Sequence, residues 1–356
     1  MHLVMGGFGI VFAAIAFADA FQTVIVARHA HKLPAVTRLF YRLTWPLFLA
    51  CVRFIPSGWR RDKYLGVYGP LSLLLLLGLW AVSLILAFAM LQWSLGLQRD
   101  GIPQRFSGDV YFSAATFFTL GAGEPGNPAS RYLMVLEAGF GYSFLGLVIG
   151  YLPVLYQSFS EREVRILMLD ARAGTPPTAL QFVLRRGGDP AKLEKRLAEW
   201  EEWALDLLQD HLSYPMLAFY RSQHANQSWL AALTTVVDVS ALAMLGAGDD
   251  LQRQARLTFA AARHALVHTA SIFDTRPAAG IGDRLCAADF SRLCDIISGA
   301  QTPLQAERIS QAELSRLRSM YEPAAIALGS YFRMELPPWI PAEQAAENWQ
   351  ISSWDF

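Results

Sequence analysis

The sequence predicts an all-α protein whose first half lies in a membrane and whose second half is soluble. Hydrophobic residues make up 53% of its 356 residues, and most of the excess lies before Tyr156 in runs of spanning length. A helix needs about 20 apolar residues to cross a bilayer. After Tyr156, apolar residues recur at three- and four-residue spacing, which is typical of amphipathic helices, and no alternating run indicates a strand.

The composition excludes several functional classes. The chain has 30 basic and 30 acidic residues, and no basic patch beyond one beside the membrane suggests a nucleic-acid partner. Its three cysteines, Cys51, Cys286 and Cys294, are scattered and fit neither a disulfide framework nor a metal site. The sequence contains no recognisable nucleophile, metal set or cofactor loop, so we expect neither an enzyme nor a bound cofactor.

Leu3 to Ala27 is the first predicted span. The segment Ala16-Phe-Ala18 resembles a signal-peptide cleavage site, but the apolar run continues past it and no positively charged stretch precedes it. These features favour an uncleaved helix. Asp19 is an acid inside this run. Either it reaches the membrane interface, or it has a function within the bilayer, where acids are costly.

Basic residues then mark the cytoplasmic side of the membrane and leave the N-terminus outside. They are Arg28, Lys32, Arg38, Arg42, Arg53, Arg60, Arg61 and Lys63. Among them, Val36 to Ile55 combines arginines with aromatic residues and is interrupted by Pro46. That composition favours a helix lying in the interface plane, with a re-entrant or buried helix as the alternative.

Leu71 to Leu95 carries no charge and is the second predicted span. A shorter apolar run of about a dozen residues begins at Tyr111 and cannot cross the bilayer. Irregular backbone follows it, and such backbone is tolerated at membrane depth only where protein or a water-filled cavity covers it. We therefore expect a re-entrant helix starting near Val110, with Ser107 or Asp109 as its cap.

The backbone after this short helix is suited to binding cations. Its sequence, Thr-Leu-Gly-Ala-Gly from Thr119 to Gly123, places glycines at alternate positions. Glycine adopts φ > 0 without a Cβ clash, so successive carbonyls can be turned the same way. A column of such oxygens replaces the hydration shell of a cation, and the carbonyl end of the short helix adds negative partial charge. The pattern predicts an ion-channel pore loop.

The segment Thr116-Phe-Phe-Thr119-Leu-Gly121-Ala-Gly123, followed by Glu124, resembles the potassium-channel pore signature TxxTxGYG followed by Asp. With its flanking helices, from about Gly69 to Tyr156, it resembles bacterial pore-loop channels that have one pore per chain. The resemblance implies a homotetramer in the bacterial inner membrane that conducts K+ or Na+. The expected filter and its support are Thr119, Leu120, Gly121, Ala122 and Gly123, with Thr116, Phe117, Phe118, Glu124 and Glu137.

The chain departs from that signature at Ala122, where these channels usually have Tyr or Phe. Their ring packs behind the filter, and losing a buried aromatic costs several kcal/mol unless another group fills the space. Phe117 and Phe118 are bulky enough to do so. The substitution leaves open whether the pore selects potassium or passes monovalent cations weakly selectively.

Tyr132 to Gln157 is the third predicted span and, by the resemblance, the inner helix that lines the conduit. Its glycines and proline have two readings: close helix packing, or a hinge that lets the helix bend and open the pore. They are Gly139, Gly141, Gly146, Gly150 and Pro153. Glu137 would lie behind the filter, where it either braces the loop through hydrogen bonds or faces the outer vestibule.

The soluble half is predicted to be cytoplasmic and helical. Helical periodicity covers Ala191 to Leu212, Trp229 to Leu245, Asp250 to Phe273 and Leu285 to Ile297. No Gly-x-Gly-x-x-Gly follows a strand, so this is not the nucleotide-binding domain of many bacterial channels. We interpret His211, His264 and His268 as structural. The aromatic tail, with Trp339, Trp349, Trp354 and Phe356, is expected to dock on the helical domain or on a neighbouring subunit.

Three parts follow from these predictions: an N-terminal span and interfacial helix (1–65), a pore domain (66–159) and a cytoplasmic domain (160–356). The first functional hypothesis is a tetrameric cation channel whose partners are its own copies and membrane lipid, with an unidentified regulatory ligand on the cytoplasmic domain left open. The second is a non-conducting membrane sensor or scaffold that keeps the channel fold. Current through purified protein in bilayers and the axial structure of the oligomer distinguish these two hypotheses, and reversal potentials in a potassium/sodium gradient distinguish a selective from a weakly selective channel.

Overall fold

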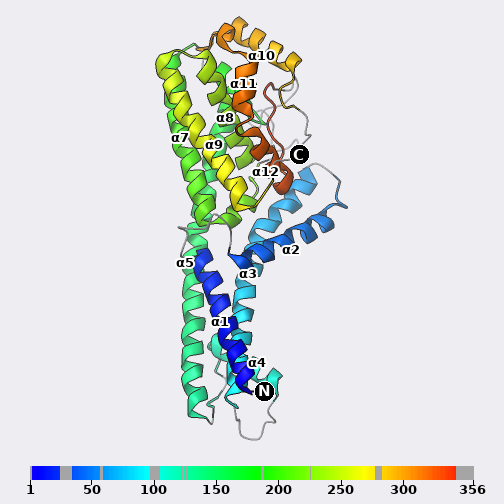
Figure 1. The fold of residues 1–356 in the computed structure, drawn as a ribbon, viewed down its shortest axis with the longest axis vertical. Helices are drawn as coiled ribbons and strands as arrows, with labels where there is room; N and C mark the ends of the chain where they lie inside the picture. The colour runs from blue at the N-terminus through cyan, green and yellow to red at the C-terminus, as the bar shows by residue number, and fades with distance from the viewer. Residues whose placement is uncertain are drawn as a thin grey trace, which may run out of the picture. The chain divides into compact units, whose positions relative to one another are not determined.

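The structure, a computed structural model, is all-helical in the part of the chain that it describes (Figure 1). It describes residues 2–24, 34–56, 59–96, 105–121, 123–125, 127–185, 188–224, 226–276 and 283–341. The chain divides into a membrane unit, Met1–Pro56 with Val67–Gln157, and a soluble unit, Ser57–Gly66 with Ser158–Phe356. The prediction of an all-α fold is confirmed. Residues up to Pro56, assigned above to a separate N-terminal part, belong to the same unit as the expected pore helices.

The membrane unit is built from long helices and one short one. They are α1 His2–Val24, α2 Ala35–Val52, α3 Trp59–Ser94, α4 Phe106–Phe117 and α5 Pro128–Ala173. The helices α3 and α5 each continue into the soluble unit, through residues 59–66 and 158–173. The three predicted spans therefore correspond to α1, α3 and α5.

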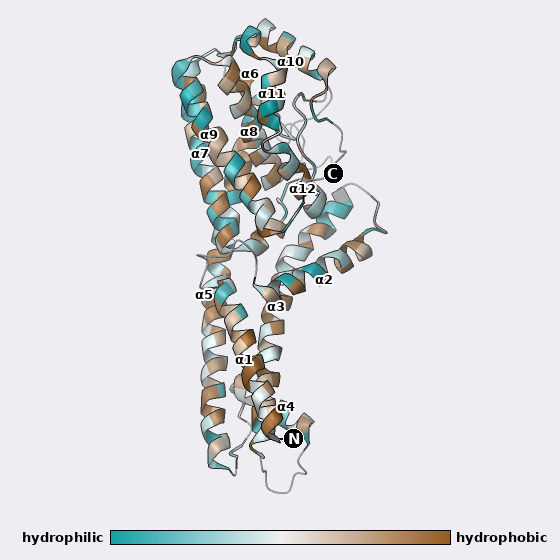
Figure 2. Cartoon of the chain, in the orientation of Figure 1, coloured by the Kyte–Doolittle hydropathy of each residue, from teal (hydrophilic) through white to brown (hydrophobic). Residues whose placement is uncertain are grey.

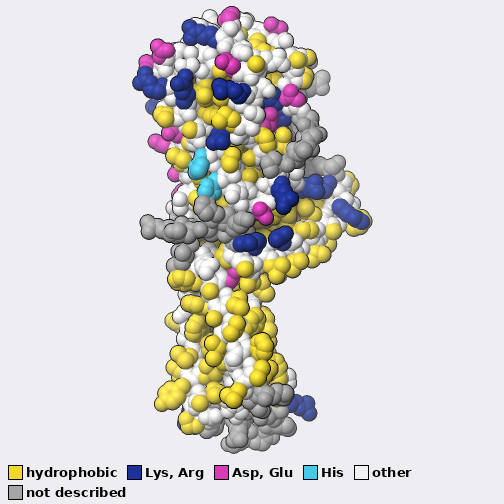
Figure 3. All heavy atoms as spheres, viewed as in Figure 1, with side chains coloured by type: hydrophobic (Ala, Val, Ile, Leu, Met, Phe, Trp, Pro, Cys, Tyr) yellow, Lys and Arg dark blue, Asp and Glu magenta, His cyan; other side chains and the backbone are white. Residues whose placement is uncertain are grey.

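The helices α1, α3 and α5 are long and apolar enough to cross a membrane. The helices of this unit are rich in hydrophobic residues (Figure 2), and besides those that are buried, many hydrophobic side chains lie on its surface (Figure 3). Phe8 of α1 is 65% exposed, and Tyr142 of α5 is 74% exposed. Contiguous exposed apolar surface of this kind indicates contact with lipid or with other subunits rather than with water. The observation supports membrane association.

A fourth apolar helix of spanning length, α8 (Trp229–Gly246), lies in the soluble unit. Nearly all of its residues are buried, including Leu233 and Val237 at 0% exposure. A helix that is apolar all round lies either in lipid or at the centre of a packed domain. Because α7 and α9 pack against it, α8 is the core helix of the soluble unit.

Asp19 joins three helices of the membrane unit. Its carboxylate accepts hydrogen bonds from the backbone N–H groups of Val36 (3.0 Å) and Thr37 (3.2 Å), at the start of α2. It also accepts from the Thr37 hydroxyl (2.7 Å) and from Nε1 of Trp80 in α3 (3.0 Å). A carboxylate at a helix N-terminus satisfies N–H groups that the helix itself cannot. Asp19, only 5% exposed, thus caps α2 from α1.

The helix α2 runs without a break through Pro46, where the sequence predicted an interruption. Its buried face packs on Tyr68 of α3, whose ring centroid lies 4.7 Å from that of Trp45 and 5.0 Å from that of Phe48. The hydroxyls of Thr44 and Tyr68 are also hydrogen-bonded (2.8 Å). Proline removes one helical hydrogen bond. Tertiary packing on both sides of Pro46 offsets that loss and keeps the helix whole.

The soluble unit is a helical domain centred on α8, beside which α7 and α9 lie (Figure 1). Its α-helices, with α8, are α6 Ala179–Leu184, α7 Pro190–Ser213, α9 Asp249–Ile272, α10 Ala287–Gly299, α11 Gln311–Arg318 and α12 Glu322–Phe332. The side chains of Thr178, Asp189 and Ser228 cap α6, α7 and α8, accepting from backbone N–H groups. The four predicted helical ranges agree with α7, α8, α9 and α10 to within a few residues.

Buried charges hold the C-terminal part of this unit to its core. Arg284 pairs with Asp238 of α8 (2.7 Å) and with Glu322 of α12 (3.0 Å), and Arg318 pairs with the same Glu322 (2.9 Å). Both guanidinium groups lie over the ring of Trp339, which is 1% exposed. The expected docking of the tail on the helical domain is confirmed for Trp339. Trp349, Trp354 and Phe356 lie outside the described residues.

His211 of α7 is a neutral core histidine. Its side chain is fully buried, and its ring centroid lies 4.5 Å from that of Trp229 in an edge-to-face arrangement. Burial, with a smaller contribution from the charge of Arg162, lowers the pKa of His211 to about 3. The interpretation of His211 as a core residue rather than a catalytic one is supported by this packing.

We expect His211 to make the soluble unit acid-sensitive. In the unfolded chain it binds a proton below about pH 6.5, whereas in the fold it stays neutral to about pH 3, so stability falls as pH falls between these values. From pH 7 to 5 the loss is about 2 kcal/mol. Thermal unfolding of the full chain in detergent is followed by tryptophan fluorescence at pH 7 and pH 5. The loss of stability between these pH values should be smaller for His211→Phe than for the wild type. The exposed His264→Phe is the control, and equal losses in all three proteins would contradict this account.

Candidate pore-loop site

The helix α4 begins earlier than the sequence predicted. Arg105 is its extended N-cap residue, without a side-chain cap, and Phe106 is its first residue. Ser107 and Asp109, the two predicted caps, therefore lie within the first turn. Asp109 is buried there, where its negative charge interacts favourably with the positive end of the helix dipole. The short helix itself was predicted correctly.

Three described residues after α4 have left-handed backbone. Thr119, Gly121 and Gly123 all have positive φ, at 56°, 82° and 81°. Both glycines thus adopt the conformation that the sequence predicted for them. Thr119 is a residue for which this conformation is strained, by about 1–3 kcal/mol. Two hydrogen bonds hold the strained turn, from Thr119 N to the Thr116 carbonyl (3.0 Å) and from Leu120 N to the Ala115 carbonyl (2.8 Å).

The remaining expected filter residues are placed only in part. Leu120 is 76% exposed on the single chain, so its side chain projects away from the helices of the membrane unit. Ala122, at the position where the chain departs from the potassium-channel signature, lies outside the described residues. Glu124 forms an exposed ion pair with Arg131 (3.6 Å), whose Nε also donates to the Pro125 carbonyl (2.9 Å). This pair connects the end of the loop to the first turn of α5.

The two phenylalanines before the filter behave differently. Phe117 is 2% exposed and belongs to a cluster with Ala16 of α1 and Leu84 of α3. Its ring also lies 5.8 Å from that of Phe144 in α5. Phe118 is 56% exposed and meets Phe117 edge to face. Phe117 therefore fixes the end of α4 to the surrounding helices, and the exposed Phe118 is available for contact with another subunit or with lipid.

Glu137 lies behind the pore helix in a buried polar cluster. The hydroxyl of Ser113 in α4 donates a hydrogen bond to its carboxylate, and both side chains are fully buried. Beside them, Nε2 of Gln92 in α3 lies 3.5 Å from the Ser130 carbonyl in α5. Of the two roles that the sequence left open for Glu137, this geometry favours bracing of the pore helix over facing the outer vestibule.

Ser113→Ala is expected to destabilise the membrane unit by about 1–2 kcal/mol, because it leaves a buried carboxylate oxygen without its donor. Ser72→Ala is the matched control. Ser72 is equally buried, but its hydroxyl donates only to the Gly69 carbonyl within its own helix (2.8 Å). Thermal unfolding of the purified protein in detergent measures both. If Ser113→Ala lost no more stability than Ser72→Ala, the bracing role of Glu137 would be contradicted.

Gly141 is the point at which α5 touches α4. A Cβ at this position would lie 2.0 Å from the carbonyl oxygen of Phe117 and 2.8 Å from its carbonyl carbon. The other expected hinge glycines, Gly139, Gly146 and Gly150, have no described atom within 4 Å of such a Cβ. Gly141 is thus required for close packing at the last residue of the pore helix. The hinge role of the others and of Pro153 stays a prediction, and α5 is continuous through all of them.

A charged cavity of about 450 Å³ lies in the soluble unit between residues 158–173 of α5 and the second half of α7. Its walls include Arg162, Arg165, Glu161, Asp206 and Asp210. Burial of Asp210, with Asp206 and Glu161 close by, raises its pKa. Neither in this cavity nor in the rest of the described residues is a group of three or more His, Cys, Asp or Glu side chains placed to hold a metal ion.

Three features of this site were not predicted from the sequence: the positive φ of Thr119, the Ser113–Glu137 bond and the contact of Gly141 with Phe117. Only the helical spacing between Glu137 and Gly141, which places them one turn apart on one face, could have suggested that they share a neighbour. Comparison with known proteins adds nothing to this geometry: no family model, curated protein or solved structure matches the chain.

Proposed function

We propose that the chain is one subunit of a homotetrameric cation channel, with the backbone of residues 119–123 as its filter. The observation that carries the proposal is the positive φ at Thr119, Gly121 and Gly123. Alternate left-handed residues turn the intervening carbonyls to one side, which is how a polypeptide makes a row of oxygen ligands for a dehydrated cation. The positive φ of Thr119 also ends α4, because the bonds from Thr119 N to the Thr116 carbonyl and from Leu120 N to the Ala115 carbonyl are those of a Schellman C-cap. Gly121 and Gly123, which lie beyond that cap, therefore carry most of the proposal.

Four subunits close the pore, because one loop supplies one wall of a conduit. The exposed apolar residues of α5 support such an assembly. Tyr132, Leu136 and Ile149 are each at least 60% exposed on the single chain, at 77%, 60% and 63%. Some of these side chains face lipid and others pack between subunits around the axis. The channel lies in the bacterial inner membrane, with the soluble unit in the cytoplasm on the side marked by the basic residues.

The permeant ion is K+ or Na+. A filter without an aromatic ring behind it relies on the number and field strength of its carbonyls rather than on a fixed diameter. Reversal potentials in a potassium/sodium gradient separate the two cases: a potential near the potassium equilibrium value indicates selectivity, and one near zero indicates weak discrimination.

Gly121→Asp tests the proposal. Purified protein is reconstituted into planar bilayers, and single-channel currents are expected from the wild type and not from the variant, because Gly121 has φ 82° and a side chain there strains the filter. Gly248→Asp is the matched control, since Gly248 is the extended N-cap residue of α9, where Asp is favoured. Equal leak through all three proteins would overturn the proposal. A stable tetramer that never conducts would favour the non-conducting sensor or scaffold.

A further inference from the structure

The helix α2 has one face packed and the opposite face exposed. Its buried residues, including Tyr41 and Trp45, lie against α3. Leu39, Leu43 and Leu47 are 57%, 57% and 66% exposed. Because they are spaced four residues apart, they form one stripe along the helix. An exposed leucine stripe on a helix at the end of a membrane unit is suited to insertion among lipid acyl chains.

Arginines border this stripe. At 100° per residue, Arg42 lies about 60° from Leu39 around the helix, and Arg53 lies about 20° from Arg42, so both are on the same edge. Figure 3 shows this arrangement on α2, with basic side chains along one edge and hydrophobic ones along the other. The guanidinium of Arg53 lies over the ring of Phe54 (4.8 Å), itself 78% exposed. The pairing of a cation with an exposed aromatic is typical of the headgroup region.

The sequence around this face is basic, and the first acid after it, Asp62, is paired with Arg221 (2.9 Å). The sequence from Ala20 to Arg61 contains seven Lys or Arg residues and no Asp or Glu. The nearest acid before it, Asp19, is buried and accepts the hydrogen bonds that cap α2. A helix with an apolar stripe, a basic edge and no neighbouring acid in its own segment is complementary to a negatively charged membrane surface.

We propose that α2 is a docking surface for anionic phospholipids of the cytoplasmic leaflet, with the leucine stripe in the acyl region and Arg42 and Arg53 on the lipid phosphates. The Asp19 cap and the Tyr68 contacts hold α2 in one orientation, so the surface is presented preformed. This inference rests on the membrane orientation given under the proposed function and not on conduction.

The test uses the full-length protein in neutral detergent micelles. Dansyl-labelled phosphatidylglycerol is titrated in, and binding is followed by energy transfer from tryptophan, in parallel with dansyl-labelled phosphatidylcholine. The wild type is expected to prefer phosphatidylglycerol. In Arg42→Gln/Arg53→Gln the affinity for that lipid should fall roughly 30-fold, from the usual contribution of a basic residue at an anionic surface, with no change for phosphatidylcholine.

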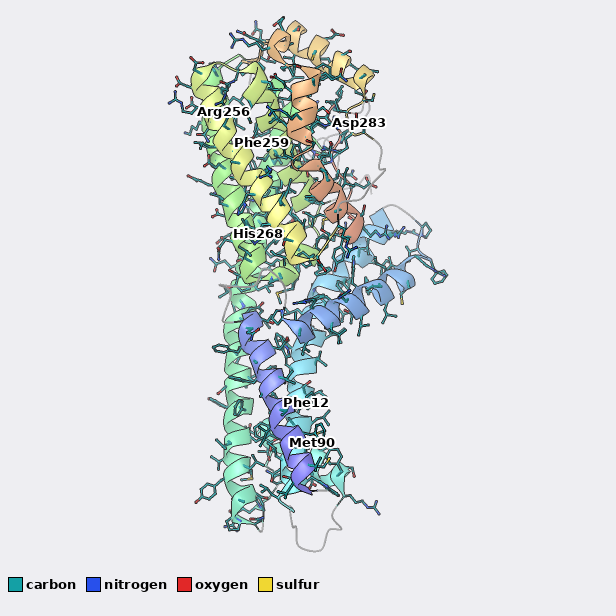
Figure 4. The ribbon with its side chains drawn as sticks, viewed as in Figure 1. Phe12, Met90, Arg256, Phe259, His268 and Asp283 are labelled. Atoms are coloured by element: carbon teal, nitrogen blue, oxygen red, sulfur yellow. The ribbon has the colours of Figure 1, made fainter. Side chains whose placement is uncertain are left out.

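Two further double variants show whether the Gln substitutions act by removing charge or by disturbing the fold. Arg42→Lys/Arg53→Lys keeps the charge and should keep the preference for phosphatidylglycerol. Arg256→Gln/Arg276→Gln removes two exposed charges from the soluble unit and should behave as the wild type (Arg256 is labelled in Figure 4). Equal affinity of the wild type for both lipids, or an unchanged preference in the Gln variant, overturns the proposal. So does a Gln variant that alters oligomer size but not lipid binding, because the face would then join copies of the chain.

The outcome is independent of the channel assay. A wild type that binds phosphatidylglycerol selectively but passes no current would contradict the proposed conduction and support the docking surface. A conducting protein with no lipid preference would do the reverse.

Discussion

Gly141→Ala is expected to abolish single-channel current and to destabilise the oligomer, whereas Gly139→Ala leaves both near their wild-type values. The alanine Cβ at position 141 would lie 2.0 Å from the carbonyl oxygen of Phe117, and 3.0 Å from its Cα. These are backbone atoms at the end of α4, so no rotamer change can relieve the clash. The helices must move apart by about an ångström or more, at a cost of about 1–3 kcal/mol for overpacking.

The effect on current should exceed the effect on stability. Phe117 is two residues before Thr119, where the left-handed turn of the filter begins. A displacement of the carbonyl end of α4 is therefore passed directly to residues 119–123, whose carbonyls line the ion path in the proposed function. Filter sites tolerate little displacement, because conduction depends on a balance between entering and leaving each site.

Comparing Gly141→Ala with Gly139→Ala separates the effect of the contact with α4 from the effect of helix flexibility. Gly139 and Gly141 lie on the same helix, two residues apart, and each substitution removes the same amount of helix flexibility. Only at Gly141 does the new methyl group meet described atoms. Bilayer recordings and thermal unfolding in detergent compare the two. Indistinguishable behaviour of Gly141→Ala and Gly139→Ala would show that flexibility of α5, not contact with α4, is the relevant property.

Asp238→Ala is expected to cost the soluble unit about 3 kcal/mol, the lower end of the range for breaking a buried ion pair. The Asp238 side chain is 1% exposed, and it accepts hydrogen bonds from Arg284 (2.7 Å) and from the Tyr321 hydroxyl. Phe259 of α9, labelled in Figure 4, packs edge to face against the ring of Tyr321. Without the carboxylate, a buried guanidinium and a buried hydroxyl lose a partner.

The remaining partners of Arg284 explain why the lower end of that range applies. Glu322 (3.0 Å) and the Pro337 carbonyl (2.7 Å) still accept from it. Burial alone would lower the pKa of Arg284, but Asp238 and Glu322 together raise it above its usual value. The variant loses the contribution of Asp238, but the guanidinium stays protonated because arginine is effectively always charged in proteins. Its charge is then only partly compensated, by Glu322.

Two variants complete this test. Asp250→Ala breaks an exposed pair with Arg253 (2.8 Å) on α9 and should change little, because exposed ion pairs contribute little in water. Asp238→Leu/Arg284→Met replaces the buried charges by apolar groups and should recover part of the loss. Urea unfolding followed by tryptophan fluorescence measures all three. A loss in Asp238→Ala as small as that in Asp250→Ala would show that the network does not hold the C-terminal part.

Much of the helical architecture was predictable because it depends on local patterns. The spans, the short helix before the filter and the four soluble helices each follow from run length or from three- and four-residue spacing. The ends of the short helix and of the soluble helices agree with the prediction to within a few residues, whereas α3 begins well before the predicted span and α5 continues well beyond it. The glycines at positions 121 and 123 were predicted to have positive φ, because few other residues adopt it without strain.

The structural features that the sequence did not predict correctly involve residues whose partners are distant in the chain. Asp19 looked like an isolated acid, and its donors at residues 36, 37 and 80 are supplied by other helices. Pro46 was expected to break a helix that packing on Tyr68 keeps whole. Ser107 and Asp109 were expected to cap α4, which instead begins at Phe106. In each case a local preference was outweighed by a tertiary contact or by a shift of one turn.

The sequence by itself determined where the chain is apolar, where it is helical and where its backbone is free to turn left-handed. These properties belong to single residues and to spacings of a few residues. Only the tertiary structure decided that Gly141 meets Phe117, that Ser113 bonds to Glu137 and that α8 is the central helix of the soluble unit. Each of these depends on which surfaces exclude one another or water, and that is settled only when separate helices pack together.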